Sequence, residues 1–361
     1  MLFHLFTSLI DQYSFLNVFK YLTFRTGLSV MTSLVVVFII GAPLIKIFSE
    51  KMITGPIRQD GPIDHIVKKS GTPTMGGVII IIGIISSTLL WADLTNLYVW
   101  TLIFVSLSLG GLGLLDDILK IKHKNSSGLK SRYKFFGQLI ISALALYILI
   151  VYSNHEFLFD LYFPFFKNLI LHMGLFFIPF GLFVIIGASN AVNLTDGLDG
   201  LATVPVMLVA LSFTLISYVV GNTIFSEYLK IQYIPDVGEL SIFCGAIVGA
   251  CLGFLWYNAP PAKIFMGDTG SLSLGGSLAA IAIIVKHEIV LAIIGGLFVL
   301  ETVSVIIQVI SFKLTGKRIF RMAPIHHHFE KKGWAESTIV IRFWIIAIIL
   351  ALVGLATLKL R

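Results

Sequence analysis

Long apolar segments dominate this chain and limit it to folds that a lipid bilayer can accommodate. Only 12% of its 361 residues are charged, and the mean hydropathy is +0.95. The hydrocarbon core of a bilayer is about 30 Å thick, which requires about 20 apolar residues per helix. Because lipid offers the backbone no hydrogen-bond partners, each such segment is predicted to be α-helical. The predicted spans are 26–48, 74–92, 97–115, 133–152, 174–192, 200–220, 240–257, 269–286, 289–312 and 338–358.

These segments predict an all-α integral membrane protein with about ten transmembrane helices. No low-complexity linker divides them, so residues 1–361 are expected to form a single polytopic domain. Residues 1–25 lack the pattern of a cleavable signal and mix aromatic with polar side chains. This composition predicts a helix that lies in the membrane interface.

The basic residues lie mostly on one side of the predicted membrane. The net charge of +7 would also suit a nucleic-acid-binding protein, but the basic residues form no stripe that could follow a groove. Nucleic acid is therefore not expected as a partner. In the ten-span topology, 17 of the 26 lysines and arginines fall on one side and 7 on the other. By the positive-inside rule the first side is cytoplasmic, and both termini are extracytoplasmic.

Polar residues that are rare in membrane spans gather near the predicted cytoplasmic ends. Such residues usually face a cavity and mark a pathway or a site. Asp116 and Asp117 follow the third span, and Lys120 comes soon after them. This combination suits a divalent metal beside a phosphate group. Adjacent helical side chains diverge by about 100°, so the two aspartates should have different roles. The alternative is a pair of solvated charges at a helix end.

A second cluster, NAVNLTDGLDG at 190–200, places a polar residue at every third position. An α-helix would spread these side chains around its axis, whereas a 3₁₀ turn or a broken segment would align them. Gly197 and Gly200 favour a break in the helix, with backbone amides that could meet a ligand.

The segment NAPPAKIFMGDTGS at 258–271 separates the seventh and eighth spans. Its two prolines end the preceding helix, because neither can donate a backbone hydrogen bond. Asp268 is then expected at the N-cap of the eighth span. As a metal ligand, it would place Mg²⁺ beside a helix N-terminus, where phosphate oxygens are favoured.

Three consecutive histidines at 326–328 lie in the basic loop before the last span. Zinc sites need separated, convergent ligands, so binding of an anionic substrate is favoured over a zinc site or a solvated loop. Glu301 and Gln308 share one face of the ninth span. Glu301 either pairs with Arg342 of the last span or is only structural.

Carboxylates, amides, lysines and histidines on the cytoplasmic face of a lipid-contacting protein favour one chemistry above others. They suit Mg²⁺-dependent transfer of a phosphate-bearing group to a membrane-embedded acceptor. A cation-coupled transporter is the alternative from another class. Transporters place their sites near the bilayer midplane, commonly between repeated halves. Here the polar clusters lie at span ends, and the sequence contains no evident repeat.

The motifs also resemble those of a known enzyme family. TPTMGG at 72–77, LLDD at 114–117, NAVNLTDGLDGLA at 190–202, FMGDTGSLSLGG at 265–276 and APIHHHFE at 323–330 are similar to motifs of the polyprenyl-phosphate N-acetylhexosamine-1-phosphate transferases. The first and last motifs resemble the phospho-N-acetylmuramoyl-pentapeptide-transferase (MraY) branch, over essentially the whole chain. Relatives that use UDP-GlcNAc share the aspartate motifs and are the nearer alternative.

The resemblance implies transfer of phospho-MurNAc-pentapeptide from UDP-MurNAc-pentapeptide to undecaprenyl phosphate, giving lipid I and UMP, in the first membrane step of peptidoglycan synthesis. It also implies a Mg²⁺ cofactor, a bacterial plasma-membrane location with a cytoplasmic active site, and a homodimer. Either the acceptor phosphate attacks the diphosphate directly, or an aspartate first forms a covalent phosphoryl intermediate. Direct attack needs fewer steps and is favoured.

Matched motif by motif, the resemblance implies roles for individual residues. Asp268 would be the main Mg²⁺ ligand, supported by Asp116 and Asn193. Asp117 would orient or deprotonate the acceptor phosphate, so that Asp116, Asp117 and Asp268 are the expected catalytic residues. The expected substrate-binding residues are Lys69, Asp196, Gly197, Leu198, Asp199, Asn258 and Phe265 at the uridine, Lys120 and Asn193 at the phosphates, and Thr74, Gln308, His326, His327 and His328 at the sugar-peptide end.

Overall fold

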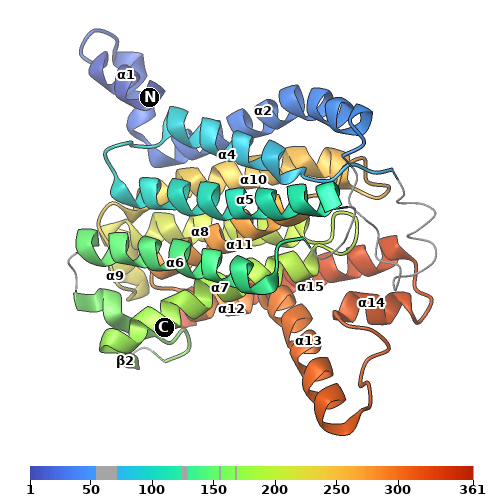
Figure 1. The fold of residues 1–361 in the computed structure, drawn as a ribbon. Helices are drawn as coiled ribbons and strands as arrows, with labels where there is room; N and C mark the ends of the chain where they lie inside the picture. Colours follow the sequence, from blue (N-terminus) through green and yellow to red (C-terminus); the bar gives the residue numbers. More distant parts are fainter. Residues whose placement is uncertain (54–70, 124–127, 154–155, 167–168, 361) are drawn as a thin grey trace.

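The structure is a computed structural model that describes residues 1–53, 71–123, 128–153, 156–166 and 169–360. Helices make up most of this part of the chain, as predicted (Figure 1). Within it, nine helices are long and apolar enough to cross a membrane. These are α2 (Leu22–Glu50), α5 (Leu97–His123), α6 (Ser131–Ser153), α7 (Phe177–Thr195), α8 (Thr203–Val220), α10 (Leu240–Asn258), α11 (Gly267–Ile284), α13 (Gly296–Thr315) and α15 (Glu336–Leu360).

The predicted span at 74–92 forms a shorter helix than expected. Helix α4 (Gly77–Trp91) is apolar but has only 15 residues. The residues before it are not helical, because their backbone bonds to another segment: the amide of Gly76 donates to the carbonyl oxygen of Phe265 at 2.8 Å. A polar contact near the helix start therefore shortens the span.

Helix α11 lies in the core of the bundle, which explains its many small residues. Every residue from Thr269 to Ile284 is buried. A Cβ at Gly275 would lie 2.5 Å from the backbone oxygen of Ala188 in α7, so the two helices can approach this closely only because position 275 is glycine. The most extensive contacts of α11 are with α5 and α7, and they bring polar residues of all three helices together.

The predicted ninth span, 289–312, is wrong as a single helix. A short helix, α12 (Glu288–Ile294), is separated from α13 at Gly295. Both halves are apolar, so hydropathy alone could not reveal the interruption, although the adjacent Gly295 and Gly296 are poor helix formers. Beyond the break, α13 projects away from the other helices (Figure 1, orange).

Short elements cover the end of the bundle where the chain termini lie, on the left in Figure 1. Two short strands form an antiparallel hairpin between α6 and α7, which the sequence did not predict in this all-α protein. The predicted interfacial helix at 1–25 is instead an α-helix followed by a 3₁₀ helix and the first turn of α2. The elements of this end are α1 (Leu2–Ser8), η1 (Ser14–Lys20), η2 (Glu156–Phe159), β1 (Asp160–Tyr162), β2 (Ile170–His172), η3 (Gly174–Phe176), α9 (Thr223–Leu229) and η4 (Val237–Glu239).

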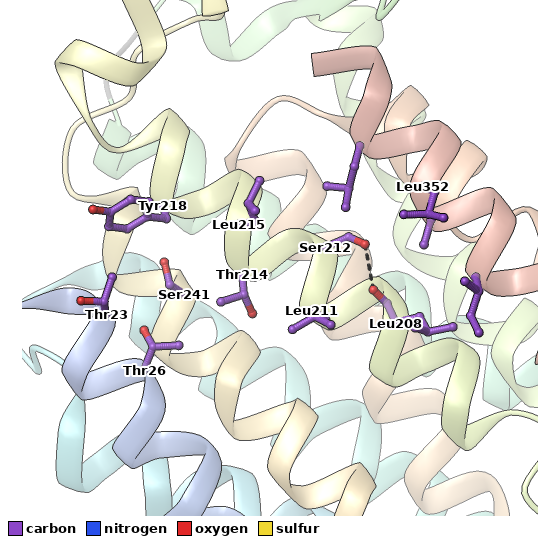
Figure 2. A pocket seen from close by; sticks show the side chains of 13 residues that line it. Thr23, Thr26, Leu208, Leu211, Ser212, Thr214, Leu215, Tyr218, Ser241 and Leu352 are labelled. Atoms are coloured by element: carbon purple, nitrogen blue, oxygen red, sulfur yellow. Dashed lines mark hydrogen bonds between the residues drawn. The ribbon is translucent and has the colours of Figure 1, made fainter. Parts of the chain in front are cut away.

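A groove of about 520 Å³ opens between α2, α8, α10 and α15 (Figure 2). Leucines of α8 and α15 form much of its wall, and Thr23, Tyr218 and Ser241 lie together at one end. None of the predicted site residues lines this groove. The candidate site is therefore elsewhere.

Candidate active site

The predicted carboxylates come together where the last turns of α5 meet the start of α11. Helix α5 does not end near residue 115, as predicted, but continues to His123. Asp116 and Asp117 therefore lie inside the helix, and both are buried. Helix α11 begins at Gly267, whose φ of +73° favours glycine. A Cβ at this position would lie 2.7 Å from an oxygen of Asp117, so glycine allows α11 to start directly against that carboxylate.

Asp117 caps α11 from a neighbouring helix. Its carboxylate accepts hydrogen bonds from the backbone amides of Asp268 at 3.2 Å and Thr269 at 3.0 Å, and from the Thr269 hydroxyl at 2.8 Å. These amides belong to the first turn, which has no partners within its own helix. The prediction that Asp268 is the N-cap is wrong, because Met266 occupies that position without a side-chain hydrogen bond.

The side chain of Asp268 is instead held by three residues from other helices. Lys134 Nζ lies 2.6 Å and Lys120 Nζ 3.0 Å from Asp268 Oδ2. Asn193 donates to Asp268 Oδ1 at 2.9 Å. Lys120 also contacts Asp116 at 2.6 Å. Two ammonium groups thus partly neutralise a tight group of carboxylates.

Asp116, Asp117 and Asp268 form a group that could hold a metal ion. Each offers one carboxylate oxygen, and these oxygens lie within 4.8 Å of one another. Carboxylate oxygens are the ligands that Mg²⁺ prefers, so the donor set fits this ion. The two adjacent aspartates differ in their contacts, as expected: Asp117 caps α11, whereas Asp116 accepts a hydrogen bond from the amide of Leu129 at 2.6 Å. Asp116 and Asp268 are therefore the better candidates for ligands.

The TPTMGG motif packs directly against this site. The amide of Phe265 donates to the carbonyl oxygen of Pro73 at 2.9 Å, and the reverse bond from Gly76 to Phe265 joins the two segments a second time. Thr74 is buried between them. A Cβ at Gly267 would lie 3.1 Å from the Thr74 hydroxyl, which places Thr74 at the start of α11. Lys69 lies outside the described residues.

The NAVNLTDGLDG segment is helical in its first half and broken in its second. Asn190 and Asn193 lie on α7, which ends at Thr195, and the predicted break follows. Asn190 donates to Gln138 in α6 at 3.0 Å, so the prediction that a 3₁₀ turn or a broken segment aligns all four polar residues is wrong for this one. Asp196 is half-buried, and burial together with the negative charges of Asp268 and Asp117 raises its pKa to about 7. Its carboxyl group thus lies close to the metal-binding group.

Other residues of the predicted uridine pocket make hydrogen bonds or apolar contacts within the protein. Asn258 accepts from the amide of Gly200 at 3.1 Å and donates to the carbonyl oxygen of Ile264 at 2.9 Å. It therefore joins the 196–202 turn to the loop before α11. Leu198 is buried in a small apolar cluster, most of whose other members belong to α15. Phe265 is half-buried.

Asp199 also holds this turn in place. Its Oδ2 accepts from the amide of Ala262 at 2.9 Å. Its own amide donates to Glu336 Oε1 at 3.0 Å. The turn is thus fastened both to the loop before α11 and to the start of α15.

The first of the three histidines packs against the 196–202 turn. His326 is fully buried, and its Nδ1 lies 3.1 Å from Oε1 of the equally buried Glu301. A Cβ at Gly197 would collide with the His326 ring, so glycine is required there. The guanidinium carbon of Arg342 instead lies 4.3 Å from the ring centre of Trp334. The possible pairing of Glu301 with Arg342 is therefore wrong.

The other two histidines and Gln308 have separate partners. His327 Nδ1 lies 2.6 Å from Oε2 of Glu330. His328 Nδ1 accepts from the amide of Arg321 at 3.0 Å. Gln308 donates to the carbonyl oxygen of Phe320 at 3.0 Å and so holds the loop after α13. These contacts shape α14 (Ile325–Glu330) and the loop before it beside the site.

Comparisons with known proteins show which family the chain belongs to. A match to glycosyl transferase family 4 covers residues 99–286, and signature 1 of phospho-N-acetylmuramoyl-pentapeptide-transferases matches residues 69–81. The chain is 69% identical over 361 residues to the phospho-N-acetylmuramoyl-pentapeptide-transferase of Pelagibacter ubique (strain HTCC1062). It is 55% identical over 371 aligned positions to the protein of the same name from Maricaulis maris (strain MCS10), and both alignments cover 100% of each chain. The chain belongs to the phospho-N-acetylmuramoyl-pentapeptide-transferase family.

The structure of this family member adds site residues that the motifs did not single out. Lys134 contacts Asp268, Thr269 binds Asp117, and Glu336 fastens the 196–202 turn. Lys134 follows the start of α6 by one turn, and a lysine placed just inside an apolar helix could have indicated the site. Nothing in the local sequence marks Glu336, because it reaches the turn only through the packing of α15.

Proposed function

We propose that this chain transfers the phospho-N-acetylmuramoyl-pentapeptide group from UDP-MurNAc-pentapeptide to undecaprenyl phosphate, producing lipid I and UMP, with Mg²⁺ as cofactor. The observation that carries this function is the convergence of three carboxylates with Lys120 and Lys134 in a helical membrane bundle. Opposite charges this close together suit a diphosphate substrate with a divalent cation. Two relatives aligned over their full length bear the name of this activity.

Asp268 and Asp116 would hold Mg²⁺, with Asn193 beside them. When bound, the ion would neutralise diphosphate charge and favour attack on phosphorus. Lys120 and Lys134 contact Asp268 directly. We expect their ammonium groups to turn to phosphate oxygens when the donor binds, because a cation at Asp268 would repel them.

The reaction forms one P–O bond and breaks another. An oxygen of the acceptor phosphate attacks the sugar-bearing phosphorus of the donor. The bond from this phosphorus to the UMP oxygen breaks, and its electron pair leaves with UMP. The acceptor phosphate is already ionised near neutral pH, so no base is required. Lys120 and Lys134 would stabilise the charge that develops on the phosphoryl oxygens.

The contacts of Asp117 favour direct attack over a covalent intermediate. Both of its oxygens already accept hydrogen bonds from the first turn of α11. A carboxylate bonded in this way is a weak nucleophile, and phosphorylation would remove a cap that the helix needs. We assign to Asp117 the role of holding α11, and with it Asp268, in position.

The 196–202 turn and Phe265 would bind the uridine, Phe265 by stacking. Asp196, at the start of this turn, would present its carboxyl group to the uridine. The histidines of α14 would lie towards the sugar-peptide end. His326 is buried behind Gly197, so it would act on the substrate chiefly by shaping the turn, whereas His327 and His328 are only half-buried.

We place this site on the cytoplasmic side of the bacterial plasma membrane. The support is the excess of lysine and arginine on the loops that flank the carboxylates. The soluble donor would then approach from the cytoplasm, and the acceptor phosphate from the surrounding leaflet.

Release of UMP from the purified protein tests this function. Undecaprenyl phosphate and Mg²⁺ would be supplied with either UDP-MurNAc-pentapeptide or UDP-GlcNAc, each with and without EDTA. We expect release only with the muramoyl donor, and its loss in EDTA. Release with UDP-GlcNAc would show that the protein uses a different donor from the one proposed. No release with either donor, from protein shown to be folded, would contradict the proposed activity.

A further inference from the structure

The β1–β2 hairpin lies at the end of the bundle opposite α14 (Figure 1), and large apolar side chains in and beside it are exposed. Phe165 and Phe166 in its loop are 51% and 63% exposed, and Leu171 on β2 is 49% exposed. Leu175 and Phe176 in η3, directly after the hairpin, are 78% and 77% exposed. Water-soluble surfaces rarely expose so many large apolar side chains together, and such patches usually mark an interaction site.

The hairpin is held firmly to the bundle from its inner side. Lys286, itself buried, donates to the carbonyl oxygen of Leu158 at 3.0 Å. The amide of Met173 donates to the carbonyl oxygen of Phe159 at 3.0 Å and closes the base of the hairpin itself. The rings of Phe159 and Phe177 meet edge to face at 6.4 Å. The exposed side chains therefore project from a fixed base.

Exposed apolar residues continue from the hairpin onto the helices that are expected to face lipid. Phe176 leads directly into α7, where Phe183 is 72% exposed within a predicted membrane span. On the adjacent α6, Tyr147 and Val151 are also exposed near the same end. A surface joined in this way to lipid-facing helices is expected to meet the lipid headgroups first.

Aromatic side chains recur around this end of the bundle. Tyr13 and Phe15 of the N-terminal segment are exposed, as are Phe225 and Tyr228 of α9. Phenylalanine lies in hydrocarbon or at its boundary, and tyrosine is enriched at the headgroup level of membrane proteins. Together with the hairpin, these residues form an incomplete belt of the kind that marks a membrane interface.

We infer that the β1–β2 hairpin lies on the membrane surface and inserts Phe165 and Phe166 among the lipids of the leaflet opposite the carboxylate site. The hairpin thus anchors the ends of α6 and α7 in the interface. Transfer of its exposed apolar side chains out of water stabilises this position. The inference does not depend on the proposed enzymatic activity.

Spin labelling in lipid nanodiscs tests this placement. Cys244 and Cys251 are both buried, so unmodified protein serves as the unlabelled background. A nitroxide would be attached to the F166C variant and, independently, to L171C. F183C provides the lipid reference, and R318C, in the exposed loop after α13, provides the aqueous reference. The readout is accessibility to oxygen, which partitions into lipid, relative to a water-soluble nickel chelate.

We expect the labels at Phe166 and Leu171 to show an oxygen-to-nickel ratio well above that at Arg318 and no higher than that at Phe183. A ratio equal to that at Arg318 would place the hairpin in water and overturn the inference. Low accessibility to both reagents would also overturn it, because the surface would then be covered by protein, such as a second copy of this chain. The two labelled positions guard against a local effect of either substitution.

Discussion

At the residue scale, Asp268 is the centre of the site, since both lysines and Asn193 converge on its carboxylate. The Asp268→Asn variant keeps the size of the side chain but removes its charge. We expect Mg²⁺-dependent turnover to fall by about 100-fold or more, as for loss of a key electrostatic group. Steady-state UMP release at saturating Mg²⁺ measures this. Asp160→Asn in the distant hairpin is the control and should keep the normal rate. A normal rate in Asp268→Asn would exclude Asp268 as the metal ligand.

Glu301 and His326 form the other residue-scale unit, because both are fully buried and face each other at 3.1 Å. Removing either side chain leaves the polar group of the other buried without its partner. We therefore expect Glu301→Gln and His326→Asn to be non-additive, with a coupling energy of about 0.5–3 kcal/mol. A double-mutant cycle on the stability of the detergent-solubilised protein measures it. Strict additivity would show that the two side chains do not interact.

At the scale of the element, the backbone conformation at the start of α11 positions Asp268 beside the other carboxylates. Gly267 has a left-handed backbone, and a Cβ there would press on Asp117. We expect Gly267→Ala to lower stability by about 1–2 kcal/mol and to reduce activity, since Asp268 would be displaced. Gly187→Ala in α7, where a Cβ meets nothing within 4 Å, is the matched control and should be neutral or slightly stabilising. Equal behaviour of the two variants in melting and activity assays would contradict this role.

The same helix shows what the sequence can and cannot predict. Most of the apolar segments and the break near Gly197 follow from local patterns, and the structure confirms them. The capping of α11 by Asp117 could not be predicted from local patterns. Asp117 and Asp268 are 151 positions apart, and only the packing of α5 against α11 brings them together. The break at Gly295 was missed for another reason: hydropathy averages over both halves of the segment.

At the scale of the whole molecule, the excess of basic residues predicts one orientation in the membrane. Arg318, in the loop after α13, should face the cytoplasm, whereas Lys230, after α9, should face outward. In intact cells a membrane-impermeant maleimide should modify Lys230→Cys but not Arg318→Cys, and in inverted vesicles the pattern should reverse. The native cysteines are buried and give no background. Labelling of Arg318→Cys in intact cells would show that the orientation is the reverse of the predicted one.

The central claim is that the acceptor attacks the sugar-bearing phosphorus of the donor. A donor that carries ³²P at this phosphate tests it most directly. We predict that the protein moves this label, with the muramoyl peptide, into the lipid product. The released nucleotide should be unlabelled UMP. Label that stays in the nucleotide as UDP would mean that the sugar–phosphate bond breaks instead, and would contradict attack at phosphorus.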